Sequence, residues 1–165
     1  MEKAYDSLNE IKLIGLSTRT SNIAESDPSS AKIGDTIMQY IKENIGSKIV
    51  NNKNPGILYC AYTNYENDEH GEYTYFVGEE VTSFDNQRVE LEKLVIPKQE
   101  YVKFTVGPGA MPDVCINAWQ QVWSLNEKDF GGSRNYIADF EIYDHRAKDP
   151  SNTVFDLYIG INKSK

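Results

Sequence analysis

One order of predicted secondary-structure elements occurs twice along this sequence. That repetition limits the possible folds more than any other feature of the chain. Each half reads as strand, helix, strand, strand, and corresponding later elements lie roughly 80 residues apart. In the first half these segments are residues 11–20, 31–46, 57–65 and 73–81. In the second half they are residues 100–106, 114–123, 138–145 and 154–162. Two copies of one supersecondary unit are the simplest arrangement with this order.

Periodicity assigns each segment its type. Apolar residues recur at helical spacing in both presumed helices: Ile33, Ile37, Met38, Ile41 and Ile45 in the first, and Val114, Cys115, Ala118, Trp119, Val122 and Trp123 in the second. Ser29 or Ser30 is expected to cap the first helix and Gly46 to end it. Pro112 suits the first turn of the second helix. The strand segments are rich in β-branched and aromatic residues.

We therefore predict an α+β fold in which antiparallel strands lay one face on helices. The 165 residues form a single domain of two tandem units related by pseudo-twofold symmetry. The first unit covers about 8–81 and the second about 99–162, and residues of about 82–98 connect them.

Charge and composition exclude several classes of function. The formal net charge is −8, and no basic cluster occurs, so direct binding of nucleic acid is not expected. Cys60 and Cys115 stand alone in apolar surroundings, typical of buried thiols in a reducing cytosol, and no spacing suggests a metal or other cofactor. The polar N-terminus resembles no signal peptide, and no apolar run is long enough to span a membrane.

The stretch ADFEIYDH places an acid, Glu141, inside a strand. Side chains alternate along a strand, so Phe140 and Ile142 share one face and Glu141 and Tyr143 share the other. Spacing alone leaves two alternatives: Glu141 is a solvated outer-face residue, or it is the anionic floor of an aromatic pocket. The eleven tyrosines of the chain would suit such a pocket, because each combines an apolar ring with a polar tip.

The same element order, with AWQQVW on the second helix, FEIYD on the next strand and DLYIGI at the end, resembles the GyrI-like effector-binding domains. These small-molecule-binding domains occur fused to regulators of the AraC and MerR types and as stand-alone proteins. The resemblance implies a ligand cleft between the two units, closed by a glutamate that meets lipophilic cations. The matching positions, with Tyr75 and Tyr62 added by the internal repeat, are Glu141, Tyr143, Tyr158, Trp119, Tyr75 and Tyr62.

The resemblance favours a stand-alone binding protein for small lipophilic, cationic ligands, in multidrug sensing or transcriptional regulation through a partner protein. One alternative is a hydrolase of electrophilic molecules in which Glu141 with Tyr143 or Tyr158 activates a water. Another is a protein-binding inhibitor of the gyrase-inhibitor type. Asp139 lies two residues before Glu141, but paired carboxylates for acid–base catalysis are not the favoured interpretation.

Overall fold

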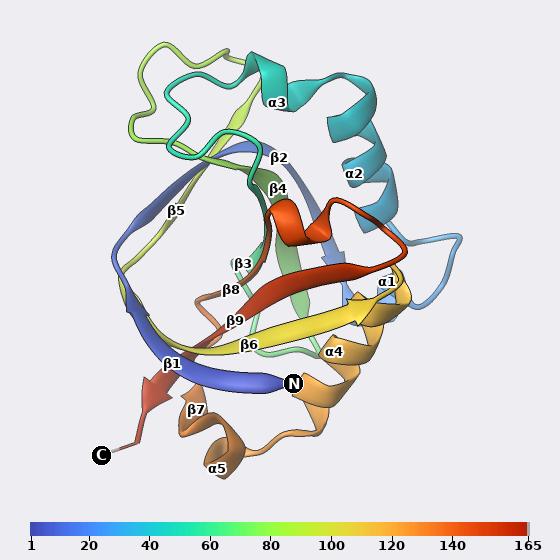
Figure 1. Ribbon diagram of the computed structural model, residues 1–165, viewed down its shortest axis with the longest axis vertical. Helices are drawn as coiled ribbons and strands as arrows, with labels where there is room; N and C mark the ends of the chain where they lie inside the picture. The colour runs from blue at the N-terminus through green and yellow to red at the C-terminus, as the bar shows by residue number, and fades with distance from the viewer. Residues whose placement is uncertain (165) are drawn as a thin grey trace.

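All strands of residues 1–164, the part of the chain that the computed structural model describes, join one antiparallel sheet. The strands are β1 (Glu2–Leu8), β2 (Ile11–Ser21), β3 (Leu58–Thr63), β4 (Glu72–Glu80), β5 (Glu92–Ile96), β6 (Gln99–Gly109), β7 (Gly132–Arg134), β8 (Ala138–Tyr143) and β9 (Thr153–Lys163). They lie in the order β1-β6-β9-β8-β3-β4-β2-β5, and β7 pairs with β9. Figure 1 shows the sheet strongly curved, with the chain termini near its lower end.

Two longer helices pack on the sheet, α2 (Ile33–Lys42) and α4 (Asp113–Ser124). Both lie on the right-hand side in Figure 1, α2 above and α4 below. The short helices are α1 (Asn22–Glu25), α3 (Ile45–Lys48), α5 (Glu127–Phe130) and the 3-10 turn η1 (His145–Ala147). The α+β class is confirmed. None of these helices is long and apolar enough to cross a membrane.

The first long helix begins and ends differently from the prediction. Lys32, not Ser29 or Ser30, is its N-cap residue, and its side chain makes no capping hydrogen bond. The carboxylate of Glu25 accepts from the backbone N–H groups of Lys32 and Ile33 instead. The helix stops at Lys42, before Gly46, because Asn44 adopts a left-handed conformation with φ of 51°.

Three strands of residues 1–164 were not predicted: β1, β5 and the short β7, which pairs with β9. β1 pairs with β6 and β5 with β2, so residues 82–98 are not a plain connection. β1 has the sequence EKAYDSL and is almost wholly exposed, which explains the absence of an apolar alternation. The six internal strands match predicted segments within a few residues.

The sheet is apolar on both faces. One face carries a cluster that includes Tyr59, Tyr101, Phe140 and Tyr158. The opposite face packs against α4 through one cluster and against α2 through another. In β8 the predicted alternation is confirmed: Phe140 and Ile142 join the first cluster, whereas Tyr143 packs with the two clusters beneath the helices.

Candidate ligand-binding site

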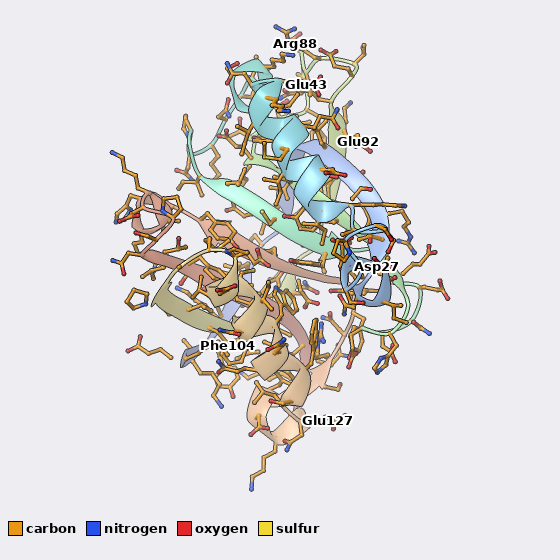
Figure 2. The ribbon with its side chains drawn as sticks, turned by 90° about the vertical axis from the view of Figure 1, so that its right-hand side faces the viewer. Asp27, Glu43, Arg88, Glu92, Phe104 and Glu127 are labelled. Carbon is orange, nitrogen blue, oxygen red and sulfur yellow. The ribbon has the colours of Figure 1, made fainter. Side chains whose placement is uncertain are left out.

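A cavity of about 540 Å³ opens on the helix-covered face of the sheet. Side chains from α1, α2 and α4 and from β3, β4 and β8 surround it: Asn22, Glu25, Ile33, Gly34, Ile37, Leu58, Cys60, Tyr62, Tyr73, Tyr75, Met111, Pro112, Cys115, Ile116, Trp119, Trp123, Glu141 and Tyr143. Figure 2 faces this side of the molecule, with α2 above, α4 below and Asp27 marking the loop between α1 and α2. The walls are aliphatic and aromatic, and among residues 1–164 the charged lining groups are the carboxylates of Glu25 and Glu141.

Glu141 lies at the base of this cavity and is 2% exposed. One of its oxygens, Oε2, accepts from the Tyr62 hydroxyl and from Trp119 Nε1, both at 2.7 Å. The other, Oε1, accepts from the Tyr143 hydroxyl at 2.6 Å. Hydrogen bonds to a charged acceptor are short and strong, so these three donors stabilise the ionised carboxylate. Within residues 1–164 no Lys, Arg or His side chain forms a salt bridge with it.

Sheet register explains how these donors reach one acid. β3 and β8 are antiparallel neighbours in which Cys60 lies opposite Glu141. Tyr62, two residues along β3, therefore points to the same face and meets Glu141 on the diagonal. Tyr143, two residues after Glu141 on β8, shares its face, and Trp119 donates from the buried side of α4.

Aromatic rings gather around Tyr62. Its ring centroid lies 4.7 Å from that of Trp119, 5.3 Å from that of Tyr75 and 5.5 Å from that of Tyr73. All of these rings line the cavity. The result is a box of π faces next to a buried negative charge, an arrangement suited to an organic cation.

The protonation of the hydroxyls and thiols near Glu141 is fixed by burial. Burial, followed by the negative charge of Glu141, raises the pKa of Tyr62 and of Tyr143 well above the ordinary tyrosine value. The same two causes raise the pKa of Cys60 and Cys115. At neutral pH both tyrosines are therefore hydrogen-bond donors, and both thiols are neutral and weakly nucleophilic.

Five of the six predicted site residues line the one cavity: Glu141, Tyr143, Trp119, Tyr75 and Tyr62. Tyr158 does not. It lies opposite Phe140 in the β8–β9 register, so it points to the other face of the sheet and stacks on Phe140 at 4.9 Å. Ligand contacts of the five remain a prediction.

Several cavity residues escaped the sequence interpretation. Tyr73 and Cys60 stand two residues before Tyr75 and Tyr62, and period-two spacing would have placed them on the same faces. Sequence alone left open which of the two helix tryptophans faces the cleft, with Trp119 preferred; both line the cavity, although Trp123 is 43% exposed. Nothing in the sequence marked Glu25, which reaches the cavity from the short helix α1.

Asp139 shares the face of Glu141 but serves a different purpose. It is fully buried, pairs with Arg134 at 2.7 Å, and accepts from the Tyr65 hydroxyl and the Gly160 N–H. It does not line the cavity. The two acids therefore do not form a catalytic pair.

Comparison with known proteins agrees with this architecture. The family described as Cass2, integron-associated effector binding protein, matches residues 6–161. YobU of Bacillus subtilis (strain 168), named as a candidate transcriptional regulator, is 26% identical over 152 residues, which are 92% of each chain.

Among solved structures, the integron cassette protein VCH_CASS2 of Vibrio cholerae superposes with a TM-score of 0.74 at 26% identity, over 97% of this chain and 95% of that one. SAV2435 bound to tetraphenylphosphonium gives a TM-score of 0.74 at 16% identity, over 98% and 94% of the two chains, and so shows the shared fold alone. The resemblance to effector-binding domains is confirmed. The chain belongs to the Cass2 family of integron-associated effector-binding proteins.

Proposed function

We propose that this protein binds small lipophilic cations in the aromatic cavity and that Glu141 recognises their charge. The observation that carries the proposal is a carboxylate 2% exposed, open to a cavity and without an ionic partner in residues 1–164. Buried charges in proteins are normally paired. A bound cation would supply the missing charge.

The energetic argument favours a cation that is also apolar. Leaving water costs a delocalised aromatic cation little, and each ring face of Tyr62, Tyr75 and Trp119 adds roughly 0.5–2 kcal/mol through cation–π attraction. Flat walls discriminate weakly among flat ligands. The site is therefore expected to accept cations of several shapes, as in a multidrug-binding protein.

The relatives support this proposal. SAV2435, which shares the fold, is described as bound to tetraphenylphosphonium, a lipophilic cation. YobU carries a name that connects it with transcriptional regulation. A role in regulation would place the chain as the sensing component beside a DNA-binding partner.

The strand order supports the proposed internal symmetry. From the β8–β3 pair outward, the sheet continues β9, β6 on one side and β4, β2 on the other. β9 and β6 are the last and first strands of the proposed second unit, about 99–162. β4 and β2 are the last and first strands of the proposed first unit, about 8–81. The two units therefore follow the same order outward from the central pair. The cavity takes residues from both units, including Glu141 from the second and Tyr62 and Tyr75 from the first.

Hydrolysis by the same acid has less support. Glu141 already accepts four hydrogen bonds in residues 1–164, three of them on Oε2 from Tyr62, Trp119 and the Cys115 thiol. Tyr158 lies on the other face of the sheet. A general base needs an acceptor position directed at a water. Binding without turnover is the function that we propose.

Titration with tetraphenylphosphonium, followed by quenching of tryptophan fluorescence, tests the proposal. We expect saturable binding of this cation, with weaker binding of neutral triphenylphosphine oxide. Glu141→Gln is expected to remove most of the preference for the cation. Glu43→Gln, which makes the same change of net charge at the exposed end of α2, is expected to keep it. Equal affinity of cation and neutral compound for the native protein would refute the proposal.

A further inference from the structure

A second carboxylate, that of Glu25, lines the same cavity. Glu25 is the last residue of α1, on the segment that leads to α2. Its Oε2 accepts from the Thr20 hydroxyl at 2.6 Å and from the Lys32 N–H at 2.8 Å. Its Oε1 accepts from the Ile33 N–H at 3.2 Å. These contacts fix the position of the carboxylate at the start of α2.

The hydrogen bonds of Glu25 leave acceptor capacity unused. A carboxylate offers about four acceptor positions, and three protein donors occupy them here. Oε1, with a single donor, keeps one position open. In residues 1–164 Glu25 forms no salt bridge, so its negative charge, like that of Glu141, lacks an ionic partner.

Tyr73 connects the two acids across the cavity wall. Burial raises the pKa of Tyr73, and the charges of Glu25 and Glu141 both add to the increase. Both carboxylates thus act on one hydroxyl. That hydroxyl donates to Asn22 Oδ1, on the same short helix as Glu25. On the other side, the Tyr73 ring contacts the ring of Tyr62, whose hydroxyl donates to Glu141.

In the described part of the chain, residues 1–164, no basic residue lines the cavity to balance these charges. The two formal negative charges of this mainly apolar cavity favour ligands with two positive charges. The electric field of Glu25 also acts on a ligand that is bound at Glu141. An aromatic cation bound at Glu141 would satisfy one charge only. A second cationic group on the same ligand could meet Glu25, the other carboxylate of the lining.

We propose that the cavity prefers dicationic ligands, in which an aromatic cation rests at Glu141 and a second ammonium group, joined by a short linker, rests at Glu25. This inference rests on the proposed function, because it takes cation binding at Glu141 as given. Glu25 then determines specificity between singly and doubly charged compounds. Its role as a cap of α2 fixes where the second charge must lie.

Ethidium and propidium provide the test, because they share the phenanthridinium ring and differ in a quaternary ammonium tail. Their dissociation constants are measured by fluorescence with the native protein, Glu25→Gln, Glu25→Asp and Glu43→Gln. We expect propidium to bind the native protein about tenfold more tightly than ethidium, consistent with one additional partly solvated charge pair. Glu25→Gln should abolish that ratio, while Glu25→Asp, which keeps the charge, and Glu43→Gln should retain it.

A second measurement needs no variant. Alkane chains with a trimethylammonium group at both ends compete for bound ethidium against chains of equal length with one such group. We expect the doubly charged chain to compete better at one spacer length. Equal affinity of ethidium and propidium for the native protein, or a propidium preference that survives in Glu25→Gln, would overturn the inference. Absence of ethidium binding to the native protein would refute the proposed function instead.

Discussion

Replacing Trp119 with phenylalanine separates the two tasks that the structure gives this side chain. The indole Nε1 donates to Glu141 at 2.7 Å, and the ring forms part of the aromatic box around Tyr62. Phenylalanine keeps an aromatic ring but removes the donor. The substitution therefore weakens the support of a buried carboxylate while leaving most of the wall in place.

The expected cost to folding follows from the kind of bond removed. A hydrogen bond to a charged group contributes about 1.5–3 kcal/mol, and a buried acceptor that loses a donor is expensive. Trp119 is 7% exposed, so little water would replace the donor. Two hydroxyl donors to Glu141 and the weaker Cys115 thiol remain, which limits the loss. We expect the free energy of unfolding to fall by about 2 kcal/mol, and the affinity for a cation to fall by about threefold, since a ring remains for cation–π contact.

Urea unfolding followed by circular dichroism measures the first quantity, and ligand titration measures the second. The matched control is Trp123→Phe on the same helix: Trp123 is 43% exposed and donates no hydrogen bond that the structure records. Its cost should stay below about 0.5 kcal/mol, as for most surface substitutions. Combining Trp119→Phe with Glu141→Gln completes a double-mutant cycle, in which we expect a coupling energy of at least about 1 kcal/mol.

The reasoning is refuted if Trp119→Phe and Trp123→Phe cost the same, because the hydrogen bond would then contribute nothing. It is also refuted if the cost of Trp119→Phe is unchanged when Glu141 is already glutamine. Either outcome would assign the role of Trp119 to packing alone.

Three further predictions concern ionisation. Burial and then the charge of Glu141 raise the pKa of Tyr62 and Tyr143, so their stabilising effect is complete below the unfolded tyrosine pKa of about 10 and is lost as pH rises through the folded values. The phenolate absorbance that Tyr62→Phe and Tyr143→Phe remove from the spectrum should therefore appear only together with the loss of circular dichroism. Its appearance in the folded protein at pH 10 would contradict this. Hydrogen bonds from Arg146 lower the pKa of Asp144, so Asp144→Asn should cost about 0.5 kcal/mol at pH 7, after allowing for solvent screening. In thermal melts the cost should decrease once the pH falls below the ordinary aspartate pKa of about 3.9 and disappear below the lowered folded value. Arg134→Met leaves the fully buried Asp139 without its partner and should lower the free energy of unfolding by about 3–5 kcal/mol in urea, whereas a loss below about 1 kcal/mol would mean that Asp139 finds another way to be satisfied.

The buried parts of this molecule were the predictable ones. The alternation of ADFEIYDH gave the correct faces for Phe140 and Glu141, because a strand packed on both sides enforces period two on its side chains. The same rule placed Tyr62 and Tyr75 on the cavity face. Periodicity failed for β1, since an exposed edge strand is held mainly by backbone hydrogen bonds that leave no trace in hydropathy.

Tyr158 shows the limit of transferring a position between strands. The resemblance assigned Tyr158 to the site, and the internal repeat transferred that position to Tyr75. A shift of one residue between two aligned strands moves a side chain to the opposite face, and the structure places these two tyrosines on opposite faces. Opposite Phe140, Tyr158 belongs to the other cluster. The position of Glu25 at the cavity could not be predicted from the sequence for another reason. Glu25 lies on a short helix that is followed by a loop, where no hydrophobic periodicity applies.

The bond between Tyr62 and Glu141 joins residues that are 79 positions apart in the chain. During synthesis, the rings of β3 and β4 therefore emerge long before the acid that completes the box. If that acid holds the ligand as we propose, the ligand recognises only the completed chain and stabilises the native state alone, by RT ln(1 + [L]/Kd). An abundant ligand would thereby increase the amount of intact protein that survives proteolysis. The cellular level of the protein would then rise with the concentration of the compound that it binds.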